Sequence, residues 1–330
     1  MRFEYVHNLR GFTILLILLA HAIAVLPSTE NISSLRLLML NSSVIFIVIA
    51  GFLFALISQR YTYKTYLINK FKNVVLPYFF LSLPAACIYI FGYKNTHSWI
   101  DMESFNQLST ITKYLYLMLT GAHLGPLWFI PMVLVFYLLF PYFVFLLGVK
   151  KINFTLILIT SLCIGMYVGR PENNDNTMQS FLYFLPAYLW GFMLYRIPNI
   201  IEFFKKYSLI LCALFIFLLP IFYDINSYSS ALDLPIKIIF ATLLYSFFSH
   251  YLDRKINAFN LLAQVSFFLY FIHGYFAGGF RMYFGSNTIE INSYLLLVGV
   301  FGSILAASLL SFYILKPFVG KYKRQLLAVS

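Results

Sequence analysis

The sequence predicts an all-α fold, a polytopic membrane helix bundle of about ten transmembrane helices with both termini in the cytoplasm. Composition is the first reason: of the 330 residues, 61% are hydrophobic and only 10% are charged, and the mean hydropathy is +0.83. A soluble domain could not bury that much apolar surface. The second reason is length, because several apolar runs of about 20 residues fit a hydrocarbon layer of about 30 Å as helices.

Apolar segments define the predicted spans in chain order. They cover residues 11–27, 37–58, 73–93, 127–148, 152–168, 179–195, 207–223, 234–249, 261–282 and 293–315. The first segment lacks a small-residue cleavage pattern and is therefore expected to be a retained helix. We expect one integral-membrane domain over residues 1–330, with no appended soluble domain.

The longest predicted outer loop, residues 94–126, carries His97, Trp99 and His123. It also contains an apolar piece at 111–119 that is too short to span a membrane. That piece predicts an interfacial or re-entrant helix.

The distribution of basic residues predicts the orientation. The chain has 23 Lys and Arg residues, of which six fall in predicted outer loops and ends, which leaves 17 on the inner side. The six are Arg36, Lys94, Lys113, Arg170, Lys237 and Arg281. An excess of Lys and Arg marks the cytoplasmic side of a membrane protein. This asymmetry also accounts for the formal charge of +12, so a nucleic-acid partner is not expected.

Two polar residues, one at the mouth of the first span and one inside it, form the first candidate site. Arg10 and His21 are eleven residues apart in "NLRGFTILLILLAH", which is about 16 Å and about three full helical turns. Both side chains therefore share one helix face, and we expect Arg10 at the cytoplasmic mouth of a cavity whose floor holds His21. A neutral imidazole there suits general-base catalysis. The alternative is a structural histidine bonded across helices, with Arg10 as a topology anchor.

A second candidate group lies late in the chain, in "QVSFFLYFIHGYF". Ser266, Tyr270 and His273 fall at positions i, i+4 and i+7, so they line one helix face. His273 lies about 18 Å into its span, close to the predicted depth of His21, and the two histidines could share a pocket. The alternative is a hydrogen-bonding seam between helices.

Three further features are weaker. Lys64, Lys70 and Lys72 cluster in the inner loop 61–78, where they would bind the phosphates of a nucleotide-like donor or, alternatively, anionic lipid head groups. Trp128 and Tyr137 lie in "GPLWFIPMVLVFYLLFP", and Tyr137 needs a hydrogen-bond partner at its depth. The pair Ala50-Gly51 permits close contact between helices. The cysteines are scattered within apolar runs and predict neither a disulfide framework nor a metal site.

Taken together and in this order, these motifs resemble those of acyltransferase family 3, and the match covers essentially the whole chain. The Arg-x10-His of the first helix is its most specific part. "IAGFLF", "KFKNVVLPY", "LWFIPMVLVFYLLFP" and "SFFLYFIH" are similar to the family's later motifs. The chain departs from the family pattern at His7, where an acidic residue is common, at Ala50, where serine is common, and at Lys70 and Lys72, where arginines are usual.

The resemblance implies a bacterial enzyme of the cytoplasmic membrane. It would move an acyl group, usually acetyl, from cytoplasmic acyl-CoA to a hydroxyl of a cell-surface polysaccharide, such as an O-antigen, or of its lipid-linked precursor, without a metal. Arg10, His21 and His273 would be catalytic, and Arg10, Lys64, Lys70 and Lys72 would bind the donor. Trp128, Tyr137, Ser266 and Tyr270 would line the substrate pocket, with membrane lipids as the other partners.

Two other classes remain open from the sequence. A glycan or lipid transporter suits a bundle with buried polar residues, although no inverted repeat is visible. A polysaccharide polymerase or glycosyltransferase of the membrane would use carboxylates of a large outer loop, for which Asp101 and Glu103 are available. Following label from acetyl-CoA against label from a sugar donor would separate these classes.

Overall fold

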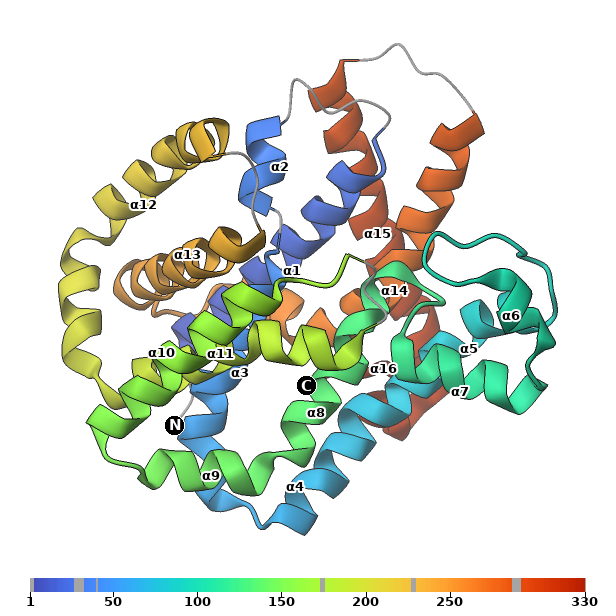
Figure 1. Cartoon of the computed structure of the whole chain (residues 1–330). Helices are drawn as coiled ribbons and strands as arrows, with labels where there is room; N and C mark the ends of the chain where they lie inside the picture. The colour runs from blue at the N-terminus through green and yellow to red at the C-terminus, as the bar shows by residue number, and fades with distance from the viewer. Residues whose placement is uncertain are drawn as a thin grey trace.

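The computed structural model describes residues 3–26, 33–39, 41–172, 176–226, 230–286 and 292–329, and they contain helices and no strand. The helices are α1 (Glu4–Ala24), α2 (Ser33–Met39), α3 (Ser43–Ile57), α4 (Tyr63–Lys70), α5 (Leu76–Ile90), α6 (Met102–Gln107), α7 (Thr110–Thr120), α8 (Phe129–Leu138), α9 (Phe140–Gly148), α10 (Lys151–Val168), α11 (Thr177–Arg196), α12 (Pro198–Asn226), α13 (Ser230–Tyr251), α14 (Asn257–Ser286), α15 (Ser293–Val319) and α16 (Lys323–Leu327) (Figure 1). Short turns of other helix types are η2 (Ser58–Arg60), η3 (Phe71–Val75), η4 (Gly125–Trp128) and η5 (Gly320–Tyr322).

Long apolar helices confirm the predicted fold class, an all-α membrane bundle. Within the described ranges, seven segments are long and apolar enough to cross a membrane. They are Glu4–Ala24, Leu35–Arg60, Tyr63–Ile90, Lys151–Val168, Ala231–Tyr251, Asn257–Phe284 and Ser293–Leu327. An eighth span results if Thr110–Thr120 and Gly125–Leu138, which are bent by 74° relative to each other, are counted together. Helices α11 and α12 occupy two other predicted spans but are not among the seven.

The predicted span at 127–148 is not one continuous helix. Helix α8 ends at Leu138 and α9 begins at Phe140, and Figure 1 shows α9 turning away from α8. Pro141 supplies the physical reason, since it lacks an N–H and its ring collides with the carbonyl four residues earlier in a regular helix. The apolar piece predicted at 111–119 is α7, one half of the bent pair that ends at Leu138.

The outer surface of the bundle is apolar, as a lipid-facing surface must be. Large hydrophobic side chains are exposed along α10, α12 and α15, among them Leu156, Ile159, Phe217, Leu310 and Ile314. In water a patch of this size would drive association. In a bilayer it lies against acyl chains while the helices satisfy their own backbone groups.

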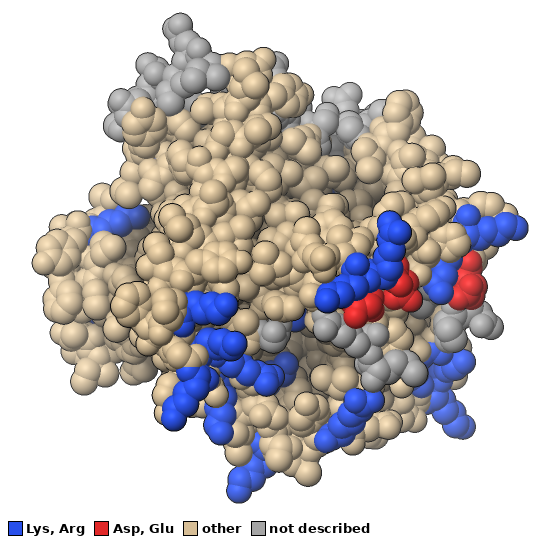
Figure 2. All heavy atoms as spheres, turned by 180° about the vertical axis from the view of Figure 1, so that it is seen from behind, with Lys and Arg blue, Asp and Glu red and all other residues tan. Residues whose placement is uncertain are grey.

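Basic residues gather on one side of the bundle. Figure 2 shows most Lys and Arg over the lower half of the molecule, and both chain ends marked in Figure 1 lie in the same half. Lys64, Lys72 and Lys150 are exposed. From the excess of Lys and Arg we predict that this half of the molecule faces the cytoplasm.

Two helix pairs position the centre of the molecule. Helix α1 packs against α14, and α3 packs against α11. The second pair approaches closely because glycines face each other's backbones: a Cβ at Gly51 would lie 2.0 Å from the carbonyl oxygen of Tyr188, and one at Gly191 would lie 2.3 Å from that of Val48. The role in close helix contact predicted for the Ala50-Gly51 pair is thus present at Gly51.

Candidate active site

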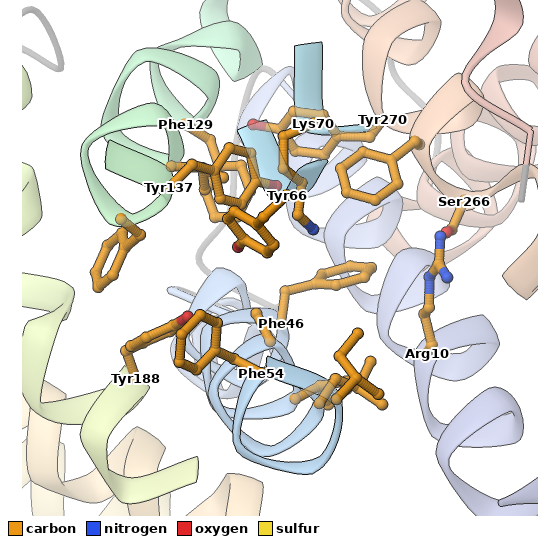
Figure 3. A pocket seen from close by; sticks show the side chains of 17 residues that line it. Arg10, Phe46, Phe54, Tyr66, Lys70, Phe129, Tyr137, Tyr188, Ser266 and Tyr270 are labelled. Carbon is orange, nitrogen blue, oxygen red and sulfur yellow. The ribbon is translucent and has the colours of Figure 1, made fainter. Parts of the chain in front are cut away.

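Two cavities meet at Tyr270 in the middle of the bundle. The first, here called the Arg10 cavity, is lined by Arg10, Lys70 and Tyr137 together with aromatic and aliphatic side chains (Figure 3). The second, here called the His21 cavity, is lined by His21, Trp128 and residues of the loop before α6. Tyr270 lines both. The sequence predicts one chamber for Arg10 and His21, but in the structure they line two different cavities. Tyr270 forms the partition between these cavities. Helix α1 is long enough to place its two polar residues on opposite sides of it.

The Arg10 cavity is small and apolar. Its volume is about 210 Å³, below the roughly 300–1,000 Å³ usual for ligand pockets. Phe46, Phe54, Phe129 and Tyr188 are among the aromatic side chains of its wall in Figure 3. A cavity of this size and lining has room for a small or slender apolar group.

Arg10 carries one unused donor at the edge of this cavity. Its Nε donates to the Oγ of Ser266 at 2.9 Å, and its guanidinium carbon lies 5.3 Å from the ring centre of Phe267. Its Nη2 is buried and has no hydrogen-bond partner in the described part of the chain. A buried donor without a partner carries a desolvation cost, so a ligand oxygen in this position would be favoured.

Lys70 is held over aromatic faces on the same cavity. Its Nζ lies 4.6 Å from the ring centre of Tyr137 and 5.2 Å from that of Tyr66. Lys64 and Lys72, by contrast, are exposed and line neither cavity. Of the three lysines predicted to bind a donor, the structure brings only Lys70 together with Arg10.

The His21 cavity is larger and more polar, with a volume of about 530 Å³. Its wall includes His21 of α1, Trp128 of η4 and Tyr270 of α14. Trp128 is nearly buried and stacks on Phe184 at 5.6 Å between ring centres. Trp128 therefore lines this cavity from within the packed bundle.

His21 and His273 form a pair, as their similar predicted depth suggested. Their ring centres are 4.9 Å apart. His273 is fully buried and donates from Nδ1 to the carbonyl oxygen of Leu269 at 2.9 Å. Its Nε2 is then the unprotonated nitrogen, and it has no partner among the described residues. His21 is only half buried and lines the cavity, so it is the histidine that a substrate can reach.

Tyr270, which separates the cavities, is hydrogen-bonded to η4. The hydroxyl of Tyr270 donates to the carbonyl oxygen of Pro126 in η4. This bond joins α14 to the segment that carries Trp128. Ser266 and Tyr270 thus bond across to Arg10 of α1 and to η4, whereas His273 bonds within its own helix.

His97, in the loop before α6, and His123, between α7 and η4, have structural partners. His97 donates from Nε2 to the carbonyl oxygen of Ala122 at 2.8 Å, and its Nδ1 accepts from the backbone N–H of Trp99 at 2.9 Å. His123 donates from Nδ1 to the carbonyl oxygen of Leu117 at 3.0 Å. These bonds fold the loop over the His21 cavity, which both histidines and Trp99 line.

Asp101 and Glu103, the carboxylates available to a glycosyltransferase, lie away from both cavities. Asp101 caps α6 by accepting from the backbone N–H of Glu103 at 3.1 Å and from the hydroxyl of Ser104 at 2.5 Å. The Ser104 hydroxyl bond, with help from backbone N–H groups, holds the pKa of this exposed carboxyl below its ordinary value. An acid that stays ionised is poorly suited to protonating a leaving group.

A buried polar network behind the His21 cavity was not predicted. Arg170 donates to the side-chain oxygen of Asn41, and the amide nitrogen of Asn41 donates to Asp233. Lys237 is fully buried and donates to the carbonyl oxygens of Leu37 and Leu38, at 2.7 and 2.9 Å, near the end of α2. The sequence signal was available, since an Asp and a Lys four residues apart at the start of an apolar helix share one face.

The fold and the site define a polytopic membrane protein in which a histidine pair stands beside the partition between two cavities. Among the residues placed by the structure, no group of three His, Cys, Asp or Glu side chains could hold a metal ion. The family model described as an acyltransferase domain, that of acyltransferase family 3, matches residues 3–315. The chain belongs to this family and is a membrane acyltransferase. No curated protein and no solved structure matches it.

Proposed function

We propose that the protein transfers an acetyl or other acyl group from cytoplasmic acyl-CoA to a hydroxyl of a cell-surface polysaccharide or its lipid-linked precursor. The observation that carries this proposal is the contact between His21 and His273, 4.9 Å apart by ring centres, at a partition with a cavity on each side. One cavity offers cations and an apolar slot, and the other offers room and an accessible imidazole. Two substrates could therefore approach one histidine from different sides.

The donor occupies the Arg10 cavity, which lies toward the basic half of the molecule in this proposal. Arg10 and Lys70 attract phosphate or carbonyl oxygens, and the unused Nη2 of Arg10 takes one of them as a hydrogen-bond acceptor. A volume of about 210 Å³ admits the acyl group and part of the arm that carries it, while the nucleotide stays at the basic surface. The thioester then reaches past Tyr270 to His21.

The reaction is a direct transfer in which His21 acts as general base. His21 takes the proton of the acceptor hydroxyl, the hydroxyl oxygen forms a bond to the thioester carbonyl carbon, and the carbon–sulfur bond breaks. The departing thiolate receives the proton from His21, which returns to its neutral form. The products are the ester and free coenzyme A.

His273 is a positioning residue in this scheme. Its Nε2 has no hydrogen-bond partner among the described residues. It can therefore accept a hydrogen bond from a ring N–H of His21. That bond would fix which nitrogen of His21 carries a proton at rest and leave the other as the base. Tyr270 and Trp128 shape the wall along which the acceptor lies.

The direct test is acetyl transfer by the purified protein in vesicles. Labelled acetyl-CoA supplied on one side should yield labelled glycan and free coenzyme A, and mass spectrometry of surface glycan should lose an acetyl increment when the protein is absent. Movement of glycan across the membrane without acyl-CoA would support a transporter instead. Ping-pong kinetics would indicate that the reaction passes through an acyl-histidine intermediate instead of a direct transfer with His21 as general base.

Arg10→Ala is expected to weaken the use of acyl-CoA. Losing a charge-assisted hydrogen bond of about 1.5–3 kcal/mol corresponds to a rise of about tenfold or more in the KM for acyl-CoA. Steady-state kinetics at fixed acceptor concentration would measure it. Arg324→Ala, which removes an exposed arginine of α16, is the matched control with unchanged KM. If the KM for acyl-CoA of Arg10→Ala were unchanged, Arg10 would not bind the donor.

A further inference from the structure

One wall of the Arg10 cavity is made of hydrocarbon side chains. Helix α3 contributes six residues to the lining, which recur every three or four positions along one helix face: Phe46, Ile49, Ala50, Leu53, Phe54 and Ile57. The polar residues of the lining, Arg10, Lys70 and Tyr137 among them, come from other helices. Figure 3 shows Lys70 and Tyr137 across the cavity from Phe46 and Phe54. The cavity therefore offers different chemistry on its two sides.

We propose that these six residues, here called the α3 wall, bind the hydrocarbon chain of an acyl group longer than acetyl, and that Ala50 limits the length of this chain. The inference rests on the proposed function, which places the acyl-CoA donor in the Arg10 cavity. It narrows the acyl group of that proposal to a short aliphatic chain of the size of butyryl. Acetyl is then a substrate as well, but a weaker one.

The α3 wall suits the acyl chain better than it suits the arm of coenzyme A. The arm carries amide groups, and burying an amide without a hydrogen-bond partner costs free energy. The backbone groups of a membrane helix are already bonded within the helix, and the six side chains of the α3 wall are hydrocarbon. Partners for the amides stand on the other walls, where Arg10 has its unused Nη2 and Lys70 its ammonium group. An alkyl chain needs no such partner, so it is the part of the donor that belongs against α3.

The volume of the cavity exceeds what an acetyl group fills. An apolar cavity of about 150 Å³ takes up benzene, a ring of six carbon atoms, and the Arg10 cavity measures about 210 Å³. An acetyl group would place a single methyl group against the α3 wall. Each apolar surface that is left without a neighbour forfeits dispersion contacts. A chain of the size of butyryl recovers these contacts and still leaves room for part of the arm.

Ala50 forms a recess in the α3 wall. It has the smallest side chain of the six and is exposed, although it lies on a cavity wall within the bundle. The bulky Phe46 and Phe54 stand one turn before and one turn after it. Phe54 is buried and stacks on Phe192 at 5.5 Å between ring centres, and the backbone of α3 meets that of α11 at Gly51. Because these contacts hold α3 in place, the recess at Ala50 sets how much chain the wall accepts.

Displacement of labelled acetyl-CoA from the purified protein tests the inference without any acceptor. The competitors are unlabelled acetyl-CoA, butyryl-CoA and octanoyl-CoA. Each methylene that moves from water to an apolar wall strengthens binding about fourfold, so butyryl-CoA should bind about tenfold more tightly than acetyl-CoA. Octanoyl-CoA, whose chain exceeds the space beside the arm, should bind more weakly than butyryl-CoA.

Ala50→Leu fills the recess and should abolish the preference for butyryl-CoA, so that butyryl-CoA and acetyl-CoA bind equally well. Ala306→Leu makes the same change at an exposed position of α15 that lines neither cavity, and it should keep the preference of about tenfold. The ratio of two ligands on one protein is measured, so a general loss of donor affinity does not alter the reading. The chain-length series on the unchanged protein tests the inference even if Ala50→Leu does not fold.

Three results would overturn the inference: equal binding of acetyl-CoA and butyryl-CoA, tighter binding of octanoyl-CoA than of butyryl-CoA, or an unchanged preference in Ala50→Leu. Each of them leaves the proposed function standing, because each requires that the protein binds acyl-CoA. A protein that binds none of the three donors would overturn both proposals. The expected preference for butyryl-CoA without transfer to any glycan would count against the proposed function only.

Discussion

Purified His21→Ala should lose nearly all acyl transfer while still binding acyl-CoA. A positioned general base contributes roughly 10²–10⁴ in rate, so kcat should fall by at least about a hundredfold. The KM for acyl-CoA should change little, because the donor contacts of Arg10 and Lys70 lie in the other cavity. Release of free coenzyme A and labelled ester from labelled acetyl-CoA measures both quantities.

His250→Ala is the matched histidine control, since His250 is exposed at the end of α13, where its ring contacts Tyr251, and it lines neither cavity. Its rate should equal that of the unchanged protein. The double variant His21→Ala, His273→Ala should be no slower than His21→Ala alone, because residues that act as a unit are not additive. Normal turnover by His21→Ala would show that another group removes the proton.

The sequence could predict which polar residues share a helix face more readily than which of them meet across helices. The spacing of Arg10 and His21 on one helix, and of Ser266, Tyr270 and His273 on another, follows from helical periodicity alone. That α1 packs against α14, and so brings the two histidines to 4.9 Å, depends on tertiary contacts that no local pattern encodes.

The division into two cavities could not be predicted for a similar reason. It depends on Tyr270 bonding to the carbonyl of Pro126, a backbone group 144 residues earlier. Arg170 escaped prediction because it lies in a connection between α10 and α11 without a surrounding motif. Its contacts with Asn41 and Trp128 join segments that lie far apart in the sequence.

Gly191→Ala should destabilise the bundle more than any surface substitution. A Cβ at this position would lie 2.3 Å from the carbonyl oxygen of Val48 and 2.5 Å from the backbone nitrogen of Phe52. Both are backbone atoms of α3, so no side-chain rotation relieves the collision. Overpacking of this kind costs roughly 1–3 kcal/mol, and a lower midpoint of thermal unfolding in detergent would report it.

Gly51→Ala should behave in the same way, because its Cβ would meet the carbonyl oxygen of Tyr188 from the opposite helix. Small residues at such a contact allow two membrane helices to approach closely. The same contact shapes the Arg10 cavity, which Ala50 of α3 and Tyr188 of α11 both line. Separating the helices should therefore also raise the KM for acyl-CoA, in proportion to the loss of stability.

Gly302→Ala on α15 separates the collision from the general effect of removing a glycine. A Cβ at Gly302 meets nothing within 4 Å, and alanine is favoured over glycine in a helix by about 1 kcal/mol. This variant should unfold at the same temperature or slightly higher. If Gly191→Ala were as stable as Gly302→Ala, α3 and α11 would not be in backbone contact. The positions assigned to Ala50 and Tyr188 on the Arg10 cavity would then also be wrong.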